Sequence, residues 1–265
     1  MTDPAAIYDA WFVPVLFAPV AEQMVAGTAL PPQARVLDVG CGTGIVARTV
    51  AARLRGQGAV TGLDLNPAML AVARQAADAA GMAITWVQGD AQALPFPEAS
   101  FDLVFCQQAI QFLPDRAAAV AEMHRVLAPG GEVAVACWRG LARNPFFARL
   151  AHAVEQRTGS DALATPYALD DPRDLAGFLQ QAGFRDVSVE PIAFTAVYTD
   201  PDDFVEMQIT ASAAGIRALQ GISASDLAAV IDAVRADMAE PLRETTVNGE
   251  LHVPVQGMLA RGARR

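Results

Sequence analysis

Lysine is absent from this sequence of 265 residues, and cysteine and histidine are scarce, with three of each. All 19 basic residues are therefore arginines, and 29 Asp and Glu residues give a formal net charge of −10. Such a chain repels phosphate backbones, so we expect neither nucleic acid nor an anionic membrane surface as a partner. The basic tail 261–265 is a local exception that a solvated terminus explains.

Other absences exclude further classes of protein. Three widely spaced cysteines do not form a disulfide framework, and no C-x-x-C or Cys/His spacing predicts a metal site. Charges or prolines break every apolar run before 18 residues, so no membrane-spanning helix is expected. The first residues, Met1 to Pro4, lack the basic region of a secretory signal. We therefore expect a cytoplasmic protein without a metal.

What is present is a regular alternation of strands and helices over the first 138 residues. Apolar residues form 53% of the chain, enough for a large core. Short apolar runs at 35–39, 59–64, 84–87, 101–106 and 132–137 read as buried strands. Helical patterns lie between them at 45–55, 66–81 and 115–127, and a turn is expected at 129–131. This alternation predicts right-handed crossovers and a parallel, doubly wound α/β sheet.

The remaining segments are less regular. Residues 8–27 form an apolar helical pattern that Pro14 and Pro19 are expected to interrupt. After the fifth strand we expect helices at 144–158 and 171–183, a strand from 185 to 190 that extends toward 198, and a last strand at 251–259. We interpret the chain as one domain, 1–265, with a helical cap (1–30), a ligand-binding core (35–138) and a helical insert (198–246).

The strongest signal for function is the stretch VLDVGCGTG, where the first strand ends and a helix begins. Glycine is needed where a ligand approaches the backbone or φ is positive. Gly40, Gly42 and Gly44 form G-x-G-x-G, whereas a dinucleotide fingerprint has G-x-G-x-x-G. Asp38 would repel a pyrophosphate but suits a ligand with ammonium and sulfonium groups. A nicotinamide-dependent oxidoreductase and a purely structural turn are the alternatives.

Two further carboxylates follow neighbouring strands. Asp64 ends the second strand, where an acidic side chain can accept hydrogen bonds from both ribose hydroxyls. Asp90 follows the third strand, where it can accept a hydrogen bond from an adenine amino group. The alternatives are a capping or surface role for Asp64 and a turn role for Asp90.

These segments together resemble a known family. VLDVGCGTG, GLDLNPAML, QGDAQALPFP, FDLVFCQQAIQFLPD and RVLAPGGEVAVACW, in this order, resemble class I S-adenosylmethionine-dependent methyltransferases. The branch is that of ubiquinone/menaquinone-type C-methyltransferases and small-molecule methyltransferases. The resemblance implies a Rossmann-like, seven-stranded, mostly parallel sheet with an antiparallel last strand and a helical insert before it. It also implies transfer of a methyl group from S-adenosylmethionine to a small, hydrophobic acceptor by in-line displacement.

The resemblance implies cofactor contacts by position. The glycines would lie under the methionine part, with Asp38 near its amino group, and Asp64 would hold the ribose. The full implied set is Asp38, Gly40, Cys41, Gly42, Gly44, Asp64, Leu65, Asn66, Asp90, Ala91 and Gln107. A protein that binds S-adenosylmethionine without transfer, or a non-methylating enzyme such as a cyclase, is an open alternative.

No general base can be named from the sequence. A sulfonium is already electrophilic, so positioning supplies most of the rate and a base matters only when the acceptor loses a proton. His152 and Gln107 are the candidates; we expect His124 on a solvated face and His252 in a packed or surface position. Cys41, Cys106 and Cys137 all fall near the carboxyl ends of strands, so we expect all three thiols near the cofactor.

An aromatic roof is expected over the acceptor, formed by the cap, the segment after the fifth strand and the insert. These residues could equally be core. The predicted acceptor contacts are Tyr8, Trp11, Phe12, Gln108, Trp138 and Phe146, and further roof candidates are Phe17, Phe147, Met207 and Ile209. The expected partner is a small-molecule acceptor, and the apolar cap would allow either a monomer or a homodimer.

Overall fold

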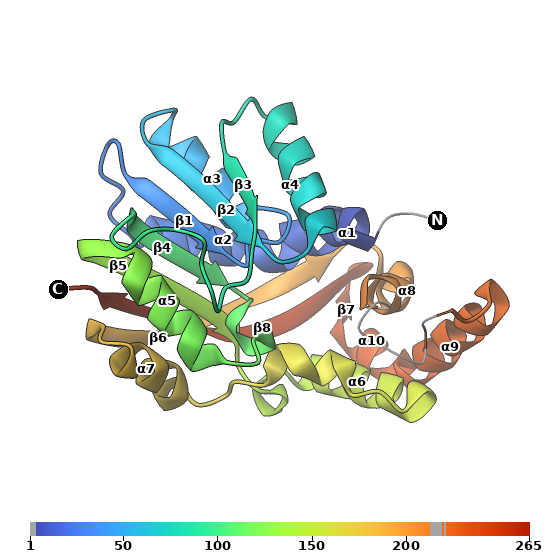
Figure 1. The fold of residues 1–265 in the computed structure, drawn as a ribbon. Coiled ribbons are helices and arrows are strands. Elements are labelled where there is room, and N and C mark those ends of the chain that lie inside the picture. The colour runs from blue at the N-terminus through green and yellow to red at the C-terminus, as the bar shows by residue number, and fades with distance from the viewer. Residues whose placement is uncertain (1–3, 213–218, 220) are drawn as a thin grey trace.

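The structure is a computed structural model that describes residues 4–212, 219 and 221–265 (Figure 1). Its described residues form an eight-stranded sheet in the order β3-β2-β1-β4-β5-β8-β6, with β7 paired to β8. The pairs among β1 to β5 are parallel, and β8 is antiparallel to both β5 and β6. The predicted doubly wound α/β fold with an antiparallel last strand is confirmed; the short β7 raises the predicted seven strands to eight.

The strands follow the sequence pattern closely in the first half of the chain. They are β1 (Arg35–Val39), β2 (Ala59–Asp64), β3 (Thr85–Gln88), β4 (Phe101–Gln107), β5 (Leu127–Trp138), β6 (Arg185–Tyr198), β7 (Thr246–Val247) and β8 (Glu250–Ala263). The turn expected at 129–131 lies inside β5, because a shift in the β4–β5 register accommodates these residues as an irregularity of the strand.

The described helices are α1 (Pro4–Ile7), η1 (Tyr8–Phe17), α2 (Ala18–Ala26), α3 (Ile45–Leu54), α4 (Pro67–Ala79), α5 (Arg116–Val126), α6 (Pro145–Thr158), α7 (Pro172–Gln181), α8 (Pro201–Ser212), α9 (Ala224–Asp237) and α10 (Ala239–Thr245). Short 3-10 helices are η2 (Ile110–Phe112), η3 (Leu141–Arg143) and η4 (Ala162–Tyr167). Four of the described helices, α4, α5, α7 and α9, begin at a residue whose side chain caps them. Asn66 starts α4 by accepting a hydrogen bond from the Ala68 N–H at 2.9 Å.

Hydrophobic cores lie on both faces of the sheet. In Figure 1, α5 lies in front of the sheet and α2 behind it. Neighbouring residues of a strand point to opposite faces, so Val36 joins the core that includes α2 and α3, whereas Leu37 joins the core that includes α5 and α7. The carboxyl ends of β1 to β4 therefore meet at one edge with both faces covered.

The N-terminal helix is continuous from Pro4 to Ala26, contrary to the expected interruptions. In η1 the turns are wide, as the bond from the Ala18 N–H to the Val13 carbonyl shows, and these turns accommodate Pro14. By length and composition, with 23 residues and a mean hydropathy of 1.4, this helix is the one described segment that meets the criteria for a membrane span, which the core helix of a folded protein also meets. In the structure it packs beside α3, with Val20 and Met24 fully buried.

Within the described residues, helices α8, α9 and α10 lie between β6 and β7, in the range where a helical insert (198–246) was predicted. Strand β6 extends to Tyr198, and its second half pairs with β8 beyond the reach of β5. Figure 1 shows α8, α9 and α10 gathered at this end of the long strands, away from α7. Residues 213–218 and 220 of the insert, and residues 1–3 of the cap, lie outside the described residues.

Candidate functional site

A pocket of about 780 Å³ lies at the carboxyl ends of β1 to β4. The loops after these strands form its wall, and η1 covers one side through Tyr8 and Phe17. Most of the predicted cofactor contacts line it: Asp38, Gly40, Cys41, Gly42, Asp64, Leu65, Asn66, Asp90, Ala91 and Gln107. The topology thus brings together side chains from four separate strand ends.

The three glycines of the loop have different surroundings although all have positive φ. At Gly40 (φ 66°) an added Cβ would lie 2.4 Å from the Ala109 Cβ, and at Gly42 (φ 54°) it would meet nothing within 4 Å. At Gly44 (φ 84°) it would lie 2.4 Å from the Trp86 ring. Gly44 therefore allows α3 to pack near β3 and does not line the pocket, which differs from the predicted cofactor contact.

Asp38 is a buried carboxyl group with one oxygen unused. Its side chain is 1% exposed, and Oδ2 accepts a hydrogen bond from the Ala47 N–H at 3.0 Å, whereas Oδ1 has no partner. Burial raises the pKa of Asp38 to about 7; the Ala47 bond opposes this rise and the Asp64 charge adds to it. A cationic group beside Oδ1 would satisfy that oxygen.

Asp64 connects the glycine loop to the start of α4. Its Oδ2 accepts a hydrogen bond from the Gly42 N–H at 2.8 Å, and its Oδ1 accepts one from the Asn66 N–H at 2.8 Å. Each carboxylate oxygen has a second lone pair, so Asp64 can still accept hydrogen bonds from a ligand. The side chain is half-buried in the pocket wall.

Two glutamines at the end of β4 carry unpartnered buried atoms. Gln107 donates from Nε2 to the Phe17 carbonyl at 2.9 Å, and its Oε1 has no partner. Gln108, with φ at 54°, accepts from the Trp138 N–H at 3.0 Å through Oε1, and its Nε2 has no partner. The Thr43 hydroxyl is also unpartnered. Buried polar atoms without partners are uncommon, so their concentration in one pocket wall indicates a ligand site.

The predicted aromatic roof is only partly present. Tyr8 and Phe17 line the pocket and stack with ring centres 5.0 Å apart. The other predicted aromatic contacts lie outside the lining: Trp11 is half-buried, and Phe12, Trp138 and Phe146 are buried in the core. The further roof candidates Phe147, Met207 and Ile209 also pack in that core. Helical spacing alone does not distinguish a ring that faces a ligand from one that faces another helix.

The histidines lie away from the pocket. His152 is exposed on α6, in a separate groove of about 580 Å³. His124 packs edge-on against Phe184 at 4.9 Å and is half-buried, so it does not occupy the expected solvated face. His252 lies 3.5 Å from Glu250. Within the described residues, no group of three or more His, Cys, Asp or Glu side chains could hold a metal ion.

The cysteines do not cluster as expected. Cys41 lines the pocket, whereas Cys106 and Cys137 are fully buried on the other side of the sheet, among the core residues beside α5. Burial raises the pKa of both of these thiols to about 12. The prediction considered only the position of each cysteine near the end of a strand. Because neighbouring side chains of a strand point to opposite faces of the sheet, a residue near a strand end can still point into the core, as Cys106 and Cys137 do.

Several lining residues were missing from the sequence-based prediction. Phe112 (52% exposed) is one of the three large exposed hydrophobic residues in the described part of the chain and lines the pocket, as does Leu65 (67% exposed), which was predicted. Phe112 lies in the quoted motif FDLVFCQQAIQFLPD, so a signal existed. The other unpredicted lining residues include Thr43, Met69, Gln92, Ala109, Leu113 and Pro114.

Comparisons with known proteins agree with this geometry. Residues 36–131 match a family described as "Methyltransferase domain". A demethylmenaquinone methyltransferase of Thermus thermophilus is 42% identical over 38% of this chain and 46% of that protein. The chain thus spans just under half the length of that relative, but 80% of a Lactiplantibacillus plantarum demethylmenaquinone methyltransferase, at 33% identity over 66% of the chain.

A solved structure extends the likeness to the fold. Phosphoethanolamine N-methyltransferase 2 of Haemonchus contortus, in complex with S-adenosyl-L-methionine, superimposes with a TM-score of 0.61 at 20% sequence identity. The match covers 98% of this chain and 57% of that one. At this identity the likeness concerns the fold.

Proposed function

Because the chain belongs to the class I S-adenosylmethionine-dependent methyltransferases, we propose that it transfers a methyl group from S-adenosylmethionine to a small, largely apolar and uncharged acceptor. When bound, the donor supplies a methyl group already activated by its positive sulfur. The chain's own residues bind the donor, orient the acceptor and exclude water.

The pocket wall fits the donor group by group. The free Oδ1 of Asp38 suits an ammonium group, and the open space at Gly42 leaves room for a ligand against the backbone. Asp64 retains lone pairs for ribose hydroxyls, and Asp90 can accept from an adenine amino group. The exposed side chains of Leu65 and Phe112 suit the faces of a base.

The charges of the lining disfavour an anionic acceptor. Its ionisable carboxylates are those of Asp38, Asp64 and Asp90, and none of the arginines and histidines that the structure describes lines it. An anionic acceptor would therefore be repelled. Burial raises the pKa of Tyr8 and Cys41, so neither thiol nor phenol serves as an ionised base at neutral pH. An acceptor related to the menaquinone precursor named in the relatives falls within this class.

The observation that carries the proposal is the set of unpartnered buried polar atoms in one pocket wall, on Asp38, Thr43, Gln107 and Gln108. The free cysteines suit a reducing, cytoplasmic compartment, which we propose as its location. Turnover is tested by mass spectrometry with reduced quinones and other apolar acceptors, where a gain of one CH2 marks transfer. Donor binding without any product would favour the alternative of a binding protein.

Donor binding is tested by calorimetric titration with S-adenosylhomocysteine. Asp64→Ala should weaken binding by about 2–3 kcal/mol, the loss of hydrogen bonds to a charged group. Asp102→Ala is the matched control, because that carboxylate pairs with Arg35 at 2.6 Å near the opposite ends of the strands. No binding by folded wild-type protein would overturn the proposal, as would equal losses in both variants.

A further inference from the structure

Gln92 spans the gap between Asp90 and the start of α5. Its backbone N–H donates to Asp90 Oδ1 at 2.8 Å, and its side-chain Nε2 donates to Oδ1 at 3.1 Å and to Oδ2 at 3.3 Å. Its Oε1 accepts a hydrogen bond from the Asp115 N–H at 2.8 Å. Because a backbone N–H can only donate, the amide orientation is fixed and Nε2 faces the carboxylate.

This arrangement leaves the two oxygens of Asp90 unequal. Oδ1 accepts two hydrogen bonds, whereas Oδ2 has one contact, the longer one. The remaining acceptor capacity is therefore concentrated on Oδ2. Asp90 is exposed, so without Gln92 its carboxylate would be free to rotate. The same bonds hold the pKa of Asp90 below its ordinary value, and an ionised carboxylate can accept but cannot donate.

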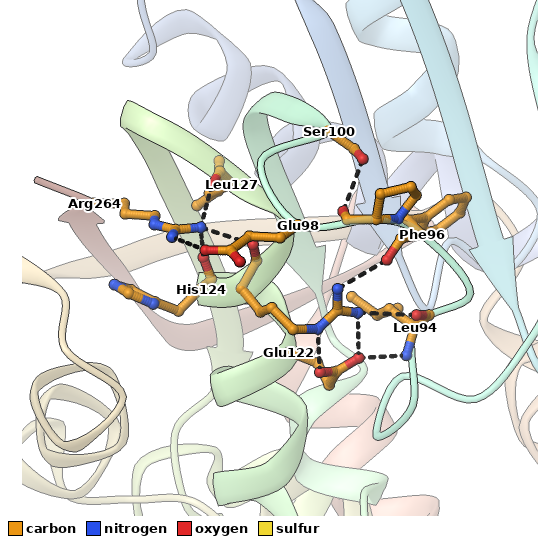
Figure 2. Close-up of polar contacts among 10 residues, drawn as sticks. Leu94, Phe96, Glu98, Ser100, Glu122, His124, Leu127 and Arg264 are labelled. Carbon is orange, nitrogen blue, oxygen red and sulfur yellow. Dashed lines mark hydrogen bonds and ion pairs between the residues drawn. The ribbon is translucent and has the colours of Figure 1, made fainter.

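Helix α5 holds the loop that follows Gln92 at a second place (Figure 2). Glu122 accepts a hydrogen bond from the Leu94 N–H at 2.8 Å. Arg125 donates to the Leu94 carbonyl at 3.0 Å and the Phe96 carbonyl at 2.8 Å, and pairs with Glu122 at 2.6 Å. The loop is thus fixed to α5 both at the N-terminus of the helix, through Gln92, and two turns further along.

We propose that Gln92 is a positioning residue that directs Asp90 toward the amino group of the adenine ring and so makes the site discriminate 6-amino from 6-oxo purines. This inference rests on the proposed function. A 6-amino group donates to the free oxygen of Asp90. A 6-oxo group presents an acceptor to an acceptor, and a carboxylate fixed by Gln92 cannot turn away to relieve the repulsion.

The test compares two ligands, S-adenosylhomocysteine and its deaminated analogue S-inosylhomocysteine, by calorimetric titration. Wild-type protein should prefer the adenosyl ligand by about 50-fold or more, as expected when a hydrogen bond to a charged group is replaced by repulsion. Gln92→Met retains the length of the side chain but cannot donate. It should weaken adenosyl binding about tenfold while inosyl binding changes less than about threefold, so that the preference falls.

Two further variants complete the design. Glu98→Gln is the matched control, because this exposed residue lies on the same loop and its carboxylate pairs with Arg264 (Figure 2); the preference should be unchanged. Gln92→Asn retains the amide but is too short to join Asp90 to Asp115, so it should lower the preference as Gln92→Met does. It serves as the second variant should Gln92→Met not fold.

The outcomes separate the inference from the proposed function. Equal losses for both ligands in the Gln92 variants would mean that Gln92 only stabilises the loop, and would overturn the inference alone. An unchanged preference would do the same. If folded wild-type protein binds neither ligand, the proposed function fails and the inference with it.

Discussion

The pocket wall and the insert side of the molecule, by which we mean helices α6 and α8 with the end of β6, use different kinds of side-chain contact. In the pocket wall, carboxylates accept hydrogen bonds from backbone N–H groups: Asp38 from Ala47, Asp64 from Gly42, and Asp90 from Gln92. Each such bond fixes the course of a loop at a strand end. The loops are thereby shaped before any ligand arrives, as a preorganised site requires.

On the insert side, aromatic rings pack against one another. Phe146 lies edge-on to Phe204 at 5.4 Å, and Phe204 lies edge-on to Tyr198 at 5.0 Å. All three rings are buried, and none lines the pocket. Carboxylates that fix a loop occur at predictable places, at the ends of strands, so the sequence reveals them. An aromatic ring has the same spacing whether it packs in the core or contacts a ligand, so the sequence does not reveal its role.

The largest expected effect tests the insert side. Phe146→Ala should lower the free energy of unfolding by about 3–5 kcal/mol, because it removes a buried ring and leaves a cavity. Urea denaturation measures this change. Affinity for S-adenosylhomocysteine, measured by calorimetry on the folded fraction, should stay within about twofold because the ring lies outside the pocket.

Phe112→Ala is the matched control, for which we expect unchanged stability and weaker ligand binding. Its ring is half exposed at the pocket edge, so the free energy of unfolding should change by less than about 0.5 kcal/mol. Binding of S-adenosylhomocysteine should weaken. A loss of ligand affinity in Phe146→Ala without loss of stability would contradict the assignment of Phe146 to the core and not to the ligand site.

The second prediction is that one glycine of the loop serves packing and another serves ligand binding. Gly44→Ala should destabilise the fold by about 2–3 kcal/mol, because its Cβ would clash with Trp86 at a positive φ. Gly42→Ala meets no neighbour, so only its backbone conformation opposes the change, at about 1 kcal/mol. Its methyl group would occupy space needed by a ligand, and affinity should fall more than about tenfold. Thermal denaturation and calorimetry on both variants check this; equal effects would contradict it.

The first half of the fold was predictable because its signals are local. Strands β1 and β2 begin and end where the sequence indicated, and α4 lies within the range predicted for it. Gly44 shows the limit, because its spacing matches a ligand loop while its contact is with Trp86 on another strand. The continuity of the N-terminal helix was also missed, because a wide turn accommodates Pro14 where a regular α-turn would not.

The candidate site was predictable where a backbone motif marks it, and not where a side chain acts through another. Asp64 and Asp90 stand at strand ends that the alternation identifies. Gln92 has no signal of its own, because its role depends on the distance to the start of α5, and that distance is set by the tertiary packing. Phe146 and Trp138 were interpreted as possible roof residues because burial cannot be derived from one sequence.

The third prediction concerns the pH dependence of the pocket wall. Burial raises the pKa of Asp38 to about 7, above its ordinary value near 4. Between these values the folded state holds a proton that the unfolded state has released, so stability falls as pH rises through this window and is level above it. An ammonium-bearing ligand prefers the ionised carboxylate. Affinity for S-adenosylhomocysteine should therefore be highest above about pH 7 and fall by up to tenfold per unit below it.

Calorimetric titrations between about pH 5.5 and 8 check this dependence. Asp38→Asn should bind more weakly above pH 7 and lose most of the slope. The carboxylate of Asp90 is not expected to contribute, because hydrogen bonds from Gln92 hold its pKa below the window. A wild-type affinity that does not change with pH would mean that no cation lies beside Asp38.

The smallest expected effect concerns His152. The residue is exposed on α6 in a groove with Arg149, Arg157 and Asp237, separate from the pocket. His152→Ala should change the free energy of unfolding by less than about 0.5 kcal/mol and leave turnover unchanged. Gln107→Leu, which breaks the bond to the Phe17 carbonyl in the pocket wall, should lower turnover in the same assay. If His152→Ala abolished turnover instead, the methyl transfer would take place beside α6 and not in the pocket. The aromatic rings near α6 would then have to be interpreted as part of an acceptor site.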